Sequence, residues 1–85
     1  MKYFLYILKS KATEKYYTGI SQNPERRLFY HNTIEKGFTS KYRPWEKVFI
    51  KEFDSKKEAL LIERKIKKWK SRKMVEKIVT GEIKL

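Results

Sequence analysis

The stretch YFLYILKSKATEKYYTGI (residues 3–20) contains two strand-like segments joined by a short polar linker. Residues 3–9 and 16–20 are rich in aromatic and branched apolar side chains, which is typical of β-strands. Residues 10–15 are polar, so we expect an antiparallel hairpin closed by a loop rather than by a two-residue turn. Gly19, near the end of the second segment, marks either a bulge or a place where another backbone or a ligand approaches closely.

A helix and a third strand are expected next along the chain. Asn23 followed by Pro24 predicts a helix start, because asparagine caps the first turn and proline lacks only an N–H that has no helical partner there. This helix should run to about Asn32 and be followed by a loop. Residues 46–53 alternate imperfectly between polar and apolar, which assigns neighbouring residues to opposite faces of a third strand.

Two helices should complete the chain. Residues 55–58, with the sequence SKKE, form a capping box that opens the first of them. The apolar stripe of this helix consists of Ala59, Ile62, Ile66 and Trp69. After a break near Ser71, a weaker helix over residues 73–79 should end at Gly81. The prediction is one α+β domain over residues 1–85, a small three-stranded antiparallel sheet flanked by helices in the order β-β-α-β-α-α.

Length and composition exclude several classes of protein. Eighty-five residues with 40% hydrophobic content can bury one modest core, so we expect a folded domain rather than a disordered tail. No apolar stretch approaches the roughly 20 residues of a membrane span, and Tyr3 and Tyr6 interrupt the N-terminal apolar run, unlike in a signal peptide. The absence of cysteine excludes disulfides and thiolate metal sites and fits a cytoplasmic protein.

Positive charge is the strongest constraint on function from composition. The chain has 22 Lys and Arg against 10 Asp and Glu, a net charge of +12, which favours a polyanionic partner through counterion release. The excess is concentrated in residues 56–77. A solubilising helix surface and an anionic membrane are the alternatives, and a charge of this size favours nucleic acid over both.

Glu63 is the most informative candidate for chemistry. On a helix it would lie about 40° from Ala59 and about 60° from Ile66, within the arc that faces the core. A carboxylate is costly to bury there unless it is paired or binds a cation. The alternative is a glutamate that turns to solvent or pairs with Lys67, four residues further on.

Arg27 and His31 lie four residues apart on the first expected helix and therefore share a face. An arginine can hold a phosphate through two hydrogen bonds and stabilise the charge that grows in a transition state. A histidine can accept or relay a proton near neutral pH. Arg26 points about 100° away from them. Taken singly, these residues also fit a solvated basic helix.

Tyr6 and Tyr17 occupy the two strands of the expected hairpin. A phenol is a poor base at its ordinary pKa of about 10 unless nearby cations lower the barrier. Cross-strand aromatic packing is the alternative role for both tyrosines, and their spacing alone does not single them out among the six in the chain.

Together these residues resemble the catalytic set of the GIY-YIG nuclease family. Family members carry a tyrosine in the first strand and a Y-[IVT]-G element in the second, which here are Tyr6 and YTG at residues 17–19. The arginine ten residues beyond the second tyrosine corresponds to Arg27, and the Tyr or His one turn later corresponds to His31. Glu63, in the context EALLIERKIKKW, matches the glutamate of a later helix. The likeness covers most of the chain.

The resemblance implies metal-dependent hydrolysis of nucleic-acid phosphodiester bonds, with DNA the favoured substrate and DNA repair one setting. Glu63 would hold a single Mg²⁺ or Mn²⁺, with waters completing its coordination, and no small-molecule cofactor is implied. Arg27 would hold the scissile phosphate, and Tyr6 would orient the attacking water. Either Tyr17 or His31 would help to deprotonate that water.

Five basic residues are expected to contact the nucleic acid. They are Lys36, Lys41, Arg43, Lys67 and Lys70. Tyr42 and Trp45 are candidates for stacking on bases, with core packing as the alternative for Trp45. The chain lacks two features of many family enzymes, an asparagine beyond the metal-binding helix and an additional DNA-binding domain. The resemblance therefore implies little sequence specificity, or a protein partner that supplies it.

Two other functions stay open on the sequence alone. A non-catalytic nucleic-acid-binding module would use the same fold and basic face without a metal. A basic adaptor would dock on an acidic protein through its C-terminal helices. Metal-dependent cleavage that needs Glu63 separates a nuclease from the binding module, and equal affinity for any polyanion would mark the adaptor.

Overall fold

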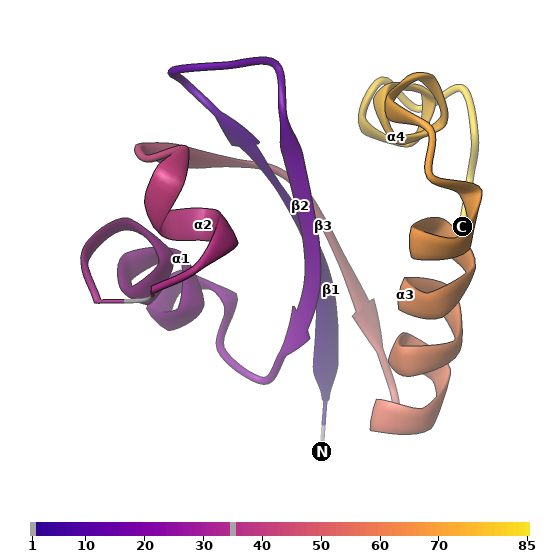
Figure 1. The fold of residues 1–85 in the computed structure, drawn as a ribbon. Coiled ribbons are helices and arrows are strands. Elements are labelled where there is room, and N and C mark those ends of the chain that lie inside the picture. The colour runs from indigo at the N-terminus through magenta and orange to yellow at the C-terminus, as the bar shows by residue number, and fades with distance from the viewer. Residues whose placement is uncertain (1, 35) are drawn as a thin grey trace.

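The computed structural model describes residues 2–34 and 36–85. Its elements are β1 (Tyr3–Ser10), β2 (Tyr16–Ser21), α1 (Pro24–Thr33), α2 (Phe38–Lys41), β3 (Trp45–Phe53), α3 (Lys56–Trp69) and α4 (Arg72–Val79). The described strands form one antiparallel sheet in the order β2-β1-β3. Helices α1 and α2 cover one face of it, and α3 and α4 cover the other (Figure 1). The predicted α+β fold with a small three-stranded antiparallel sheet is confirmed.

Strand β1 lies at the centre of the sheet, and its alternating side chains build two separate cores. Leu5 and Ile7 are fully buried in the core shared with α3 and α4. Tyr6 and Leu8 point to the opposite face, where they pack with Trp45 beside α1. Burial of each aliphatic side chain contributes about 1.5–3 kcal/mol, so the hairpin strand predicted first also supplies much of the stability.

A bulge in β3 changes the pattern expected for that strand. Ile7 of β1 pairs with Phe49. The next residue, Leu8, pairs with Lys47, so Val48 is an extra residue in β3. Val48 and Phe49 consequently pack in the same core, against α3 and α4. The expectation that neighbours along this strand face opposite sides is wrong here, because one inserted residue resets the alternation.

Capping side chains set the starts of the longer helices. Asn23 caps α1 and Ser55 caps α3, and each side chain accepts a hydrogen bond from the backbone N–H three residues on, as the sequence predicts. Helix α4 begins at Arg72, one residue earlier than expected, because Ser71 caps it in the same way. Lys70 ends α3 in the left-handed conformation, with φ 50°.

Helix α2 occupies a segment for which the sequence predicts a loop. It has four residues, begins after Gly37 at φ 88° and has no capping side chain, so it is too short to show a helical apolar period. The position of α2 matters for the candidate site because Phe38, its first residue, lies beside Tyr17 of β2. Across the described residues, none of the helices has both the length and the apolar character needed to span a bilayer.

Candidate active site

The candidate catalytic residues come from both faces of the sheet and approach one another at the edge strand β2. Tyr6 and Tyr17 lie on the face covered by α1, the helix that carries Arg27 and His31. Glu63 belongs to α3, which covers the other face (Figure 1). Its negative charge nevertheless acts on the hydroxyl of Tyr6. The site therefore includes residues from both sides of β2 rather than from one face of the sheet.

Gly19 provides the space for the Tyr6 side chain. The two residues are partners across the β1–β2 ladder, and Tyr6 is only 1% exposed. A Cβ atom built on Gly19 would lie 2.6 Å from the Tyr6 hydroxyl oxygen and 2.7 Å from the ring carbon that bears it. The close approach expected at Gly19 is thus made by the side chain of Tyr6, whose hydroxyl group lies against β2.

The substitution Gly19→Ala is expected to displace Tyr6 and to lower the free energy of unfolding by about 1–3 kcal/mol, the usual cost of overpacking. Urea unfolding of the two proteins measures this difference. In a Tyr6→Leu background the shorter side chain leaves room for the methyl group, so Gly19→Ala should cost clearly less there. An equal cost in both backgrounds would show that the contact with Tyr6 is not responsible.

Tyr6 is the centre of a buried hydrogen-bond network. Its hydroxyl oxygen lies 3.1 Å from Nε2 of His31, which is 2% exposed. Burial raises the pKa of Tyr6 above its ordinary value, and a hydrogen bond from Arg27 opposes this shift. Repulsion from the phenolate form of Tyr17 and from the carboxylate of Glu63 raises the pKa of Tyr6 further. Tyr6 is therefore a neutral phenol at physiological pH, suited to positioning groups by hydrogen bonds rather than to acting as a base.

The raised pKa of Tyr6 predicts a loss of stability at alkaline pH. The folded protein keeps the phenol proton at a pH where the unfolded chain releases it, so this contribution is complete below about pH 10 and disappears as the pH rises through the higher folded pKa. The free energy of unfolding should fall more steeply above pH 10 in the wild type than in Tyr6→Phe, as measured by urea unfolding at a series of pH values. Tyr16→Phe serves as the comparison variant. Burial also raises the pKa of Tyr16, which is more exposed than Tyr6, so this substitution should change the alkaline loss of stability in the same direction. Parallel curves for wild type and Tyr6→Phe would contradict the prediction.

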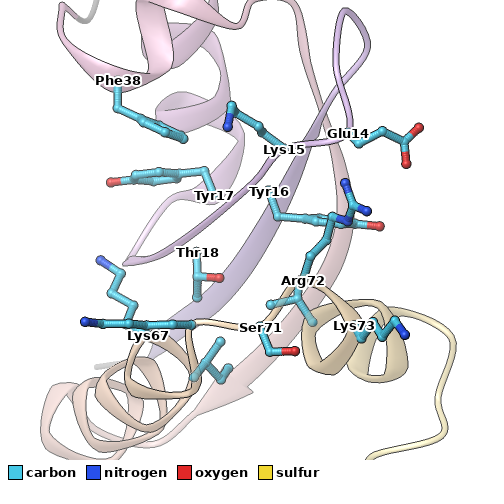
Figure 2. A pocket seen from close by; sticks show the side chains of 13 residues that line it. Glu14, Lys15, Tyr16, Tyr17, Thr18, Phe38, Lys67, Ser71, Arg72 and Lys73 are labelled. Carbon is cyan, nitrogen blue, oxygen red and sulfur yellow. The ribbon is translucent and has the colours of Figure 1, made fainter.

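Tyr17 connects the network to the outside of the molecule. Its ring centroid lies 4.7 Å from that of His31 and 6.4 Å from that of Tyr6. On the other side, the exposed Phe38 ring of α2 lies 6.4 Å away at an interplanar angle of 30° (Figure 2). The ammonium group of Lys67, from α3, reaches to 5.7 Å from the centroid of Tyr17. Tyr17 thus contacts elements from both faces of the sheet.

Glu63 is held at the junction of these elements by an ion pair. Its side chain is 14% exposed, and Oε2 lies 3.3 Å from Nζ of Lys67. The pairing considered from the sequence therefore exists, and it places a cation beside the carboxylate. Within residues 2–34 and 36–85, no three His, Cys, Asp or Glu side chains gather as a metal-binding group. The donor set fits a hydrated divalent cation held by one carboxylate, with water and substrate oxygens as its other ligands.

Two of the five basic residues expected to contact nucleic acid also have partners within the protein. Lys67 pairs with Glu63, and Nε of Arg43 donates a hydrogen bond of 2.7 Å to the backbone carbonyl of His31. The other three are exposed, namely Lys36, Lys41 and Lys70. Arg43 accordingly supports the helix that carries His31, in addition to contributing positive charge.

The structure assigns Trp45 to the core and gives Asn32 a structural role that sequence reasoning missed. Trp45 is 2% exposed and its indole N–H donates to the carbonyl of Thr39, so it does not offer a face for stacking. Asn32 accepts from the backbone N–H of Trp45 at 2.6 Å and donates to its carbonyl at 3.1 Å. This double contact fixes the end of α1 to the start of β3. Tyr42 is half-buried against the same core.

Comparison with known proteins gives a consistent family assignment. The family model of the GIY-YIG catalytic domain matches residues 2–77. A UPF0213 protein of Staphylococcus saprophyticus is 35% identical over 81 residues, which cover 94% of this chain and 98% of that protein. The solution NMR structure of a UPF0213 protein from Bacillus halodurans has a TM-score of 0.60 at 31% identity, covering 94% of this chain and 84% of that chain.

A second group of relatives consists of much longer proteins. The structure-specific endonuclease subunit SLX1 of Phaeosphaeria nodorum is 40% identical over 67 residues, or 72% of this chain. The chain spans only 18% of the length of that subunit. The similarity to SLX1 therefore concerns one domain of a larger protein.

Proposed function

Because the chain belongs to the family of GIY-YIG catalytic domains, we propose that it is an endonuclease that hydrolyses nucleic-acid phosphodiester bonds, with DNA favoured and one Mg²⁺ or Mn²⁺ as cofactor. The observation that carries this proposal is the buried network of Tyr6, His31 and Arg27, with the charge of Glu63 acting on it. A purely structural domain has no need to bury so polar a cluster, because polar burial costs free energy.

Arg27 is proposed to bind the scissile phosphate. Its guanidinium is fixed by the hydrogen bond to Tyr6 and lies on the half-buried side of α1. A guanidinium held in this way can donate two parallel hydrogen bonds to phosphate oxygens and stabilise the additional negative charge of the transition state. Because its position is set before substrate binds, little reorganisation opposes this stabilisation.

Proton transfer from the attacking water is assigned to Tyr17 or His31. Tyr6 stays neutral and hydrogen-bonds to His31, so its role is to orient the water and the imidazole. Tyr17 packs on the ring of His31, so the two candidates are adjacent, with Tyr17 half-buried and His31 buried behind it.

Glu63 would hold the divalent cation, which, when bound, offsets negative charge on the phosphate and on the leaving oxygen. Lys67, which now neutralises Glu63, can turn toward a phosphate because lysine has a long flexible stem. The SLX1 relatives carry the word subunit in their name, and a protein partner that supplies sequence or structure specificity is part of our proposal.

A cleavage assay tests the proposed function. Labelled single- and double-stranded DNA and RNA are incubated with the purified protein in Mg²⁺, in Mn²⁺ or in EDTA. We expect products with a divalent cation and none with EDTA. Binding without cleavage on every substrate would instead identify a non-catalytic nucleic-acid-binding module. No preference for nucleic acid over another polyanion at physiological salt would identify an adaptor.

A further inference from the structure

A groove of about 680 Å³ runs beside β2, between α2 and the turn that joins α3 to α4. Three aromatic side chains line it, Tyr16, Tyr17 and Phe38, together with five basic side chains and one carboxylate. Figure 2 shows the rings of Tyr17 and Phe38 close to each other, and the ring of Tyr16 apart from them, beside Arg72. This lining combines apolar faces with a surplus of positive charge.

Phe38 offers a fixed apolar face at the mouth of this groove. It is 47% exposed, although it packs at 5.0 Å from the ring of Tyr42 and at 6.1 Å from that of Trp45. The rings behind Phe38 keep it in place, so a planar ligand could stack on it without first ordering the side chain.

The basic side chains of the groove are placed to hold a phosphate backbone. Lys70 follows the last residue of α3 and Lys73 lies in the first turn of α4, and both are exposed and line the groove. Stacking surfaces for bases next to cations for phosphates are the combination by which proteins bind single-stranded nucleic acid. In a duplex the faces of the bases are stacked on one another, so Phe38 can reach only a base that is unpaired.

The groove is continuous with the candidate active site. Tyr17 and Lys67 belong to both, since Tyr17 packs on His31 and Lys67 pairs with Glu63. A strand whose phosphate is held by Arg27 would therefore place its neighbouring nucleotide in the groove.

We infer that this groove binds one unpaired nucleotide next to the cleaved bond, with its base stacked on Phe38 and its phosphate held by the basic side chains that line the groove. This inference rests on the proposed nuclease function and names the substrate class, a nucleic acid with a single-stranded segment at the cleavage point. Phe38 is then a specificity-determining residue that selects unpaired strands.

The test measures binding, so that it does not depend on cleavage. All proteins carry Glu63→Gln, and fluorescence anisotropy gives their affinity for a labelled 12-nucleotide oligothymidylate and for a blunt 12-base-pair duplex at one salt concentration. Phe38→Ala should weaken binding of the oligothymidylate about 10-fold, in line with the loss of one base–aromatic stack. Binding of the duplex should change less than about twofold, because duplex binding depends mainly on charge.

Phe29→Ala is the matched control, because Phe29 is also exposed but lies on α1 and is not among the residues that line the groove. It should leave both affinities unchanged. Equal losses on oligothymidylate and duplex, or no loss on either, would overturn the inference even if the protein proves to be a nuclease. A selective loss would support the groove even if no substrate is cleaved, in which case the proposed catalysis alone fails. Thermal unfolding confirms that each variant is folded.

Discussion

The substitution Glu63→Gln is expected to lower the cleavage rate at least about 100-fold while leaving the fold intact, since removal of a single charge-stabilising group commonly costs 10²–10³ in rate. The carboxamide has the size of the carboxylate but no negative charge, so it binds a divalent cation poorly. Its side chain remains partly exposed at the rim of the site, where a neutral amide can hydrogen-bond to water. Affinity for nucleic acid should stay the same or increase, because one negative charge is lost. Cleavage rates and anisotropy titrations measure the two effects separately.

Glu58→Gln is the control for this experiment. Glu58 is an exposed carboxylate in the first turn of the same helix, so its substitution changes the net charge by the same amount without altering the site. It should keep full cleavage activity. Undiminished cleavage by Glu63→Gln would show that the carboxylate does not take part in the reaction, and the assignment of the metal ligand would be wrong.

Arg27→Ala is expected to reduce cleavage by about 10²–10³, because the site loses the guanidinium proposed to stabilise the transition state. Arg27→Lys should recover only part of this loss, since an ammonium group cannot hold two phosphate oxygens in parallel. Loss of the hydrogen bond to Tyr6 is a second effect of both substitutions. The rate should fall at saturating substrate as well as at low substrate, because the interaction strengthens in the transition state.

Arg26→Ala separates this specific role from general charge. Arg26 lies one position earlier on the exposed side of α1, and its Nε donates to the hydroxyl of Tyr30 at 2.9 Å. Both substitutions remove one positive charge, so an effect of net charge alone would appear equally in both. Equal reductions in rate for Arg26→Ala and Arg27→Ala would contradict the role proposed for Arg27.

The sequence predicts the elements that depend on local signals. The caps at Asn23 and Ser55 act within one helical turn, so the sequence alone is enough to locate the starts of α1 and α3. The bulge at Val48 depends on the pairing of β3 with a distant strand, and no pattern within residues 45–53 reveals it. Helix α2 is likewise stabilised by rings from other elements rather than by its own sequence.

The candidate site likewise contains some residues that the sequence predicts and others that only the structure reveals. The resemblance selects Tyr6 and His31, and the structure brings these two side chains within hydrogen-bonding distance. Their catalytic roles stay predictions. Phe38 carries no sequence signal because it lies in a polar loop segment, and only its three-dimensional position beside Tyr17 makes it a candidate for binding.

The position of β2 as an edge strand has a consequence for the association of the protein with itself. The outer backbone groups of an edge strand can pair with a strand of another copy, which is a common route to aggregation. Here basic side chains line the groove along this strand, and the chain carries a net charge of +12. Two copies approaching edge to edge would bring like charges closer than the screening length of about 8 Å at physiological ionic strength. The same basic side chains would thus keep copies apart and attract the polyanion. A substitution that removes one of these charges would weaken both the repulsion between copies and the attraction of the polyanion.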